Sequence, residues 1–253
     1  MNYNKNALKN RSRLSKNIIG IALALLLAGI IVVQALAAPA GGLVYATGLT
    51  APAAEIWLPG AQGGHLWVSD RAQGFCRLDP VSGLTSTLIN VSTCIKPNNI
   101  TTGQAVYDAG TNSIYLPDIA ASSLGVYRVQ YDPATETVGS PAVITAGLIA
   151  ADDTPQSAAL GPDGKLYLGL IKLGRIVRIT NPTSNGNPQK LEAVGVTSNG
   201  LPAVSLAFVA GELYVAETVN VTSLMNVAQC SGACVAAKVN VSIVSPRGFI
   251  YDA

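Results

Sequence analysis

One β-strand pattern recurs four times along this chain of 253 residues. Each copy has a polar residue after a glycine-containing or polar turn, followed by an apolar strand. The copies are HLWVSD at 65–70, SIYLPD at 113–118, KLYLGL at 165–170 and ELYVAE at 212–217. Their second positions are 48, 52 and 47 residues apart. Such alternation of aromatic or β-branched residues with small or polar ones predicts half-buried strands in a repeat protein.

Further strands accompany each copy. Downstream lie GFCRLDP at 74–80, GVYRVQYDP at 125–133 and GRIVRITNP at 174–182, each closed by an Asp-Pro or Asn-Pro turn. Fourth strands are expected at 84–91, 138–145 and 190–196, and first strands at 104–108 and 157–160. Four strands in about 48 residues predict an all-β fold, a β-propeller of four-stranded blades. The expected blades span about 53–100, 101–150, 151–198 and 199–246.

The fourth unit is less regular, and the chain continues past it. After Glu217, an insertion containing Cys230 and Cys234 is expected to delay the third strand to about 238–244. The segment FIYDA at 249–253 matches AVYDA at 105–109, so a fifth blade is expected to start at 247. We therefore expect a fragment of a six-bladed ring. The alternative is a closed four-bladed ring in which residues 247–253 supply the last strand.

The first 37 residues have the pattern of an export signal. A basic stretch precedes an apolar run from 18 to 33, and Ala35-Leu36-Ala37 gives the small-x-small pattern that signal peptidase reads. Cleavage after Ala37 would leave residues 38–52 as an N-terminal segment with a strand, followed by the propeller at 53–253. The protein is expected to be secreted or periplasmic. It would contact a membrane only through an uncleaved leader.

The net charge and the cysteines limit which ligands and which compartment the sequence favours. Removing the five basic leader residues leaves 11 basic and 14 acidic residues, so the body gives no electrostatic reason to expect nucleic acid. Cys76 pairs with Cys94 and Cys230 with Cys234 in the expected disulfides, which fit an oxidising compartment. The rival interpretation, a metal or haem site, is short of ligands because His65 is the one histidine of the sequence.

The repeats resemble those of the six-bladed NHL-repeat and gluconolactonase (regucalcin) superfamily. The resemblance rests on GPDGKLYLGL at 161–170, LYVAE at 213–217 and RLDP at 77–80, and it covers about residues 45–253. In gluconolactonase-type lactonases, a Glu at the start of the first blade binds a divalent metal. Glu55 occupies the corresponding place, and Asn199-Gly200 resembles a later blade entry. The resemblance therefore implies Glu55 and Asn199 as metal ligands, with Ca²⁺ as the candidate cofactor.

The loops that enter successive blades also suggest a site. In a propeller these loops cross one face and end near the central channel. They contain Glu55, Asn98, Asn99, Asp152, Asp153, Ser198 and Asn199. Carboxylate and amide oxygens suit a hard cation such as Ca²⁺, although the same residue types are also common loop formers. The candidate catalytic residues are Asp152 and Asp153, and the candidate ligand-binding residues are Asn98, Asn99 and Ser198.

Other polar residues are expected to be structural. Asp70, Asp118 and Glu217 recur with the repeat and are expected to bind turn backbone. His65 is expected to be exposed, and Trp57 and Trp67 to belong to the core.

Three functions remain open. The leading hypothesis is an exported binding or interaction module for a small-molecule or protein ligand, with no certain cofactor. The alternatives are a Ca²⁺-dependent lactonase and a quinone-dependent sugar dehydrogenase.

Overall fold

The computed structural model describes most of the chain beyond residue 45. The described residues are 46–61, 63–80, 89–96, 101–120, 125–145, 153–172, 174–184, 191–197, 200–218, 221–224, 234–235 and 237–238. They belong to one compact unit, Ala46–Ala253, and the other unit, Met1–Tyr45, lies outside them. No helix among the described residues is long and apolar enough to span a membrane, and the leader lies outside that range.

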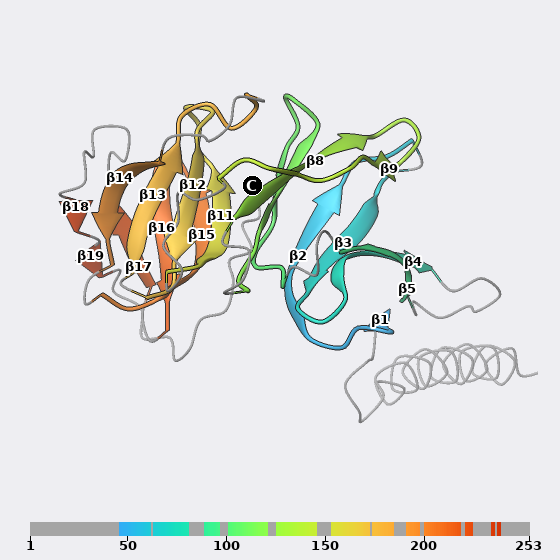
Figure 1. Ribbon diagram of the computed structural model, residues 1–253, viewed down its shortest axis with the longest axis horizontal. Coiled ribbons are helices and arrows are strands. Elements are labelled where there is room, and N and C mark those ends of the chain that lie inside the picture. Colours follow the sequence, from blue (N-terminus) through green and yellow to red (C-terminus); the bar gives the residue numbers. More distant parts are fainter. Residues whose placement is uncertain are drawn as a thin grey trace, which may run out of the picture. The chain divides into compact units, whose positions relative to one another are not determined.

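The described strands form four sheets in chain order, which we call blades 1 to 4 (Figure 1). Blade 1 contains β1 (Ala46–Thr47), β2 (Pro52–Leu58), β3 (His65–Asp70), β4 (Gly74–Pro80) and β5 (Ile89–Ile95). Blade 2 contains β6 (Val106–Asp108), β7 (Ser113–Pro117), β8 (Val126–Asp132), β9 (Thr137–Val138) and β10 (Ala142–Val143). Blade 3 contains β11 (Pro155–Leu160), β12 (Leu166–Leu170), β13 (Arg175–Ile179), β14 (Leu191–Val196) and β18 (Cys234–Val235). Blade 4 contains β15 (Ala203–Val209), β16 (Glu212–Glu217), β17 (Val221–Leu224) and β19 (Ala237–Lys238).

In blade 1, β1 pairs parallel with β5, and we count the strands of that blade from β2. The first three strands of each blade then pair antiparallel with their sequence neighbours. The four repeated segments coincide with the second strands β3, β7, β12 and β16. The all-β propeller class expected from the repeat is therefore confirmed.

Three expected strands differ from the structure. In place of the strand expected at 84–91, the structure has β5 at Ile89–Ile95, and residues 84–88 lie outside the described residues. The strand expected at 138–145 is split into β9 and β10, because Pro141 has no N–H to donate to a continuous ladder. In blade 4 the third strand is β17, which follows the second strand closely, so the expectation of a third strand near 238–244 was wrong. This segment lacks the Arg and the Asp-Pro or Asn-Pro turn of the other third strands, which concealed it.

Each pair of successive blades shares a hydrophobic core. Three buried clusters lie between blades 1 and 2, blades 2 and 3, and blades 3 and 4. The repeated aromatic of the second strand belongs to each of them in turn, as Trp67, Tyr115 and Tyr167, all at most 1% exposed. The repeat therefore stacks because the aromatic of one blade fills the contact with the next.

The disulfide expected between Cys76 and Cys94 is confirmed. The two residues are direct partners in the register of β4 and β5, which brings their side chains to the same face. Cys234 is also disulfide-bonded, whereas Cys230 lies outside the described residues.

Candidate functional site

A β-bulge near the start of the first strand creates a common cavity. The register of β2, β11 and β15 shifts by one residue between Pro52 and Ala54, between Pro155 and Ser157, and between Ala203 and Ser205. A bulge adds one unpaired residue to a strand and redirects its side chain. The residues added here are Ala53, Gln156 and Val204.

Blade 2 contributes its equivalent residue to the same place. Gly103 lies between the Thr102–Asp118 bridge and the start of β6. A cavity of about 30 Å³ is lined by these four residues and two neighbours: Ala53, Arg71, Gly103, Gln104, Gln156 and Val204. One corresponding residue from each of four blades therefore meets at one point, which we call the axial cavity. Its volume suits a water molecule or one functional group of a ligand.

Gln104 holds three blades together beside this cavity. Its side-chain amide donates to the carbonyl of Leu206 and accepts from the N–H of Leu206, both at 3.0 Å. Its backbone N–H donates to the carbonyl of Gln156 at 2.9 Å. A Cβ on Gly103 would lie 2.1 Å from that same carbonyl, so this close approach requires glycine. Both the nitrogen and the oxygen of the Gln104 amide are therefore engaged, and the side chain positions the cavity wall.

Gln156 and Arg71 remain available in the cavity. Gln156 is only 9% exposed, and its Oε1 atom has no hydrogen-bond partner among the described residues. Arg71 is exposed, and no described carboxylate forms an ion pair with it. An unpartnered buried acceptor is costly unless a ligand or water satisfies it. Together the two side chains offer one acceptor and one cation to a ligand.

The sequence did not reveal either residue as a site residue. Arg71 follows the repeated acid Asp70, which is the one signal that could have identified it. No local pattern marks Gln156, because a bulge depends on the pairing of two strands and not on one segment.

None of the residues that the sequence predicted for the site is among the described residues that line the cavity. Glu55 is exposed in β2, two residues beyond Ala53, and does not line the cavity. Asp153 is 2% exposed and does not line it either. Five further candidates lie outside the described residues: Asn98, Asn99, Asp152, Ser198 and Asn199. The described residues contain no group of three His, Cys, Asp or Glu side chains that could hold a metal ion.

Asp153 is engaged in local structure. Its Oδ1 atom accepts the N–H of Lys172 at 3.0 Å, and its Oδ2 atom lies 2.7 Å from Nε and 2.5 Å from a terminal nitrogen of Arg175. Blade 3 has Leu170 where blades 1 and 2 have Asp70 and Asp118 at the end of the second strand. Asp153 therefore supplies to this turn the carboxylate that β12, the second strand of blade 3, lacks at its end.

The repeated acids Asp70 and Asp118 bind turn backbone, as the sequence predicted. Asp70 accepts four N–H donors, from Thr50, Ala51, Ala72 and Gln73, at 2.7–2.9 Å. Burial raises the pKa of Asp70, but these donors outweigh it and leave the pKa below its ordinary value.

The carboxylate of Asp118 accepts fewer hydrogen bonds than that of Asp70. Its Oδ1 atom accepts N–H groups of Thr101 and Ala120 at 3.1 and 2.9 Å, and its buried Oδ2 atom has no partner among the described residues. Burial raises the pKa of Asp118, and the two donors offset this only in part. The two equivalent carboxylates therefore have pKa shifts of opposite sign.

This contrast predicts different mutational costs. At pH 7, Asp70→Asn is expected to lower the free energy of unfolding by about 2 kcal/mol, because an amide nitrogen would face two N–H donors. Asp118→Asn is expected to cost less than about 1 kcal/mol, since Oδ1 keeps both donors and a buried charge is removed. Urea unfolding measures both values, and equal losses would contradict the assignment.

The pH dependence should also differ between the two sites. A carboxylate with a lowered pKa stabilises the fold above its unfolded-state pKa, and this contribution disappears as pH falls through the folded-state value. The cost of Asp70→Asn should therefore shrink below about pH 4. For Asp118 the sign is opposite, because acidification relieves a buried charge.

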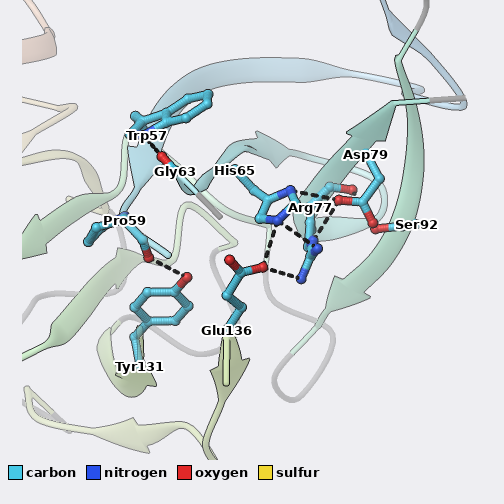
Figure 2. A network of polar contacts seen from close by, with 9 residues as sticks. All are labelled: Trp57, Pro59, Gly63, His65, Arg77, Asp79, Ser92, Tyr131 and Glu136. Atoms are coloured by element: carbon cyan, nitrogen blue, oxygen red, sulfur yellow. Dashed lines mark hydrogen bonds and ion pairs between the residues drawn. The ribbon is translucent and has the colours of Figure 1, made fainter. Parts of the chain in front are cut away.

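His65 differs from the expectation of an exposed residue. Its side chain is 16% exposed and lies between Asp79 of its own blade and Glu136 of blade 2 (Figure 2). The turn that carries Glu136 is distant in the sequence, so the repeat pattern gave no indication of this contact.

The chain was compared with known proteins by sequence and by structure. No protein-family model matches it, and no curated protein matches its sequence. The calcium structure of the Trichoderma reesei protein of Carbohydrate-Active Enzymes Family AA12 is similar, with a TM-score of 0.53 and 17% identity. That match covers 73% of this chain and 55% of the other.

Two further structures are similar in fold. The holo form of the pyranose dehydrogenase PQQ domain from Coprinopsis cinerea has a TM-score of 0.52 at 14% identity and covers 76% of this chain and 48% of that one. The extracellular domain of a putative hybrid two-component system from B. thetaiotaomicron has a TM-score of 0.51 at 16% identity. That match covers 79% of this chain and 25% of the other. The chain thus spans about half the length of the first two structures and about a quarter of the third. At such low identities the likeness shows the fold alone. The four described sheets are blades of a β-propeller.

Proposed function

We propose that this protein is an exported ligand-binding β-propeller, related to the NHL-repeat and gluconolactonase group, with its ligand site at the axial cavity. The observation that carries the proposal is that three bulge residues, Ala53, Gln156 and Val204, meet the corresponding Gly103 at one cavity, where the amide oxygen of Gln156 has no partner among the described residues. Concave sites with a few converging polar groups are the usual form of small-molecule sites. The disulfide supports export, because such bonds persist in oxidising compartments.

The polar groups of the cavity favour a small hydroxy acid as ligand. The guanidinium of Arg71 offers planar paired donors that match a carboxylate. The Oε1 atom of Gln156 can accept a hydrogen bond from a neighbouring hydroxyl. Ala53, Gly103 and Val204 add no charge, so recognition would rest on these two side chains.

The test is calorimetry with a sugar acid such as gluconate. Arg71→Gln and Gln156→Leu are each expected to weaken binding about tenfold or more, which corresponds to about 1.4 kcal/mol. Lys165→Gln is the control, because Lys165 pairs with Asp163 in a turn outside the cavity. Equal affinities for all four proteins would overturn the proposal. Sustained hydrolysis of the matching lactone would instead favour an enzyme.

The lactonase alternative requires a calcium site, which is a proposal of its own. The structural relative crystallised with calcium supports it only through its fold. Glu55 is exposed and free to accept a cation, and Asn199 and Asp152 lie outside the described residues. Calorimetry with Ca²⁺ separates the hypotheses. A calcium site at Glu55 predicts a heat of binding that Glu55→Gln reduces, whereas the binding-module proposal predicts equal heats.

The quinone-dependent alternative is less well supported. Such dehydrogenases normally recruit histidine and arginine to the cofactor. The single histidine of this sequence is held between two carboxylates and is therefore already engaged.

A further inference from the structure

Two blades are joined by a network of charged side chains away from the axial cavity (Figure 2). His65 begins β3, and Arg77 and Asp79 lie in the neighbouring strand β4 of blade 1. Glu136 comes from the turn between β8 and β9 of blade 2. The Nδ1 atom of His65 lies 2.8 Å from Oδ1 of Asp79, and Nε2 lies 2.6 Å from Oε2 of Glu136.

The network is constrained on both sides. Burial raises the pKa of Asp79, but hydrogen bonds from Arg77 and Ser92 outweigh it, so Asp79 is ionised at neutral pH. On the blade 2 side, Glu136 has a φ of 55°, a costly conformation for a residue other than glycine. A Cβ on Gly60 would lie 2.0 Å from Oε1 of Glu136, so the carboxylate fits only beside a glycine.

The ring nitrogens of His65 have different roles. Because Nδ1 faces an ionised carboxylate, it must carry a hydrogen. Nε2 lies within hydrogen-bond distance of two groups, Oε2 of Glu136 at 2.6 Å and a terminal nitrogen of Arg77 at 2.8 Å. With a hydrogen, Nε2 can donate to Glu136. Without one, it can only accept from Arg77, and its lone pair would then face the carboxylate.

We propose that His65 is a proton-dependent clasp between blades 1 and 2. Protonated His65 binds Asp79 and Glu136 together and so joins the blades. On loss of the proton, Nε2 accepts from Arg77 within its own blade. The remaining ionic link across the blades is then the 3.3 Å contact of Arg77 with Glu136.

The other groups around the imidazole do not replace this role. Tyr131 of β8 donates its hydroxyl to the carbonyl of Pro59 at 2.7 Å. Burial raises the pKa of Tyr131, so it remains a neutral phenol near neutral pH. The titratable and charged groups that face His65 are therefore Asp79, Arg77 and Glu136, with neutral Tyr131 behind them. Among these groups, the imidazole is the one of a residue type whose charge ordinarily changes near neutral pH.

The sign of the pH effect follows from the proton. Protonation lets Nε2 donate to Glu136, so the charged imidazole makes a contact between the blades that the neutral imidazole lacks. The clasp therefore strengthens the contact of blades 1 and 2 in mildly acidic medium and weakens it in alkaline medium. Histidine is suited to this because its charge ordinarily changes between pH 5 and 8.

NMR of the full chain tests the proposal directly, since the imidazole signals come from one histidine. In the wild type, both ring nitrogens should carry hydrogen at pH 5.5, and only Nδ1 should keep it at high pH. In Glu136→Gln, the loss of the Nε2 proton should move to lower pH, because the opposite charge is gone. Glu55→Gln removes an exposed carboxylate of blade 1 and should leave the curve unchanged.

Unfolding by urea gives a second readout. The stability difference between wild type and Glu136→Gln should be larger at pH 5.5 than at pH 8.5. The proposal is overturned if His65 titrates identically in wild type and Glu136→Gln, or if the stability difference does not depend on pH.

Discussion

Trp67→Ala is expected to lower the free energy of unfolding by about 3–5 kcal/mol. Trp67 is 1% exposed and stacks on Phe75, with 5.0 Å between the ring centroids. Both rings belong to the cluster between blades 1 and 2. Truncation would remove a large buried surface and leave a cavity that the rigid strands around it cannot close. Urea unfolding followed by circular dichroism measures the loss.

Trp57→Ala is the matched control for this prediction. Trp57 is 59% exposed, and its indole nitrogen donates one hydrogen bond to the carbonyl of Gly63 at 3.2 Å. Its replacement should cost less than about 1 kcal/mol, as is usual for surface positions. The sequence placed both tryptophans in the core, which holds for Trp67 only. Similar losses for the two variants would show that the blade contact is not packed as described.

Gly169→Val is expected to cost about 3 kcal/mol or more, the upper end of the range for overpacked cores. A Cβ at this position would lie 2.5 Å from Oγ of Ser157, 2.8 Å from Cβ of Ala203 and 2.9 Å from the carbonyl of Ala203. That carbonyl also accepts the hydroxyl of Ser157 at 3.1 Å. The substitution would therefore separate blade 3 from blade 4 beside the axial cavity.

Gly139→Val separates this effect from a general loss of glycine. Neither glycine has a positive φ, so valine brings no backbone strain of that kind at either position. At Gly139, a Cβ would meet its nearest atom, the carbonyl of Gln130, at an ordinary 3.4 Å. This control should stay within about 0.5 kcal/mol of the wild type, as surface changes usually do. A comparable loss in both variants would contradict the close contact of blades 3 and 4. Because Gly169 adjoins the cavity wall, its variant should also weaken gluconate binding.

The candidate site was only partly predictable. The sequence placed its candidates at the entries to successive blades, and Ala53 and Gln156 of the axial cavity lie in the first strands of blades 1 and 3. It selected Glu55 and Asp153 from those segments because carboxylates are the usual ligands and bases. The structure assigns Asp153 to a turn through Arg175 and leaves Glu55 outside the cavity. A buried amide oxygen without a partner cannot be recognised in a sequence, because burial depends on the packing of other blades.

The sequence by itself determined the second strand of each blade, most of the other strands and the Cys76–Cys94 disulfide. These features depend on local patterns: alternation with a period of two, glycine and proline in turns, and the pairing of consecutive strands. The tertiary structure alone decided which residues line the axial cavity and which carboxylates hold His65. Gln156 reaches the cavity through a shift in strand register, and Glu136 reaches His65 through the stacking of two blades. Such contacts join residues far apart in the chain, and their geometry arises only when neighbouring sheets pack.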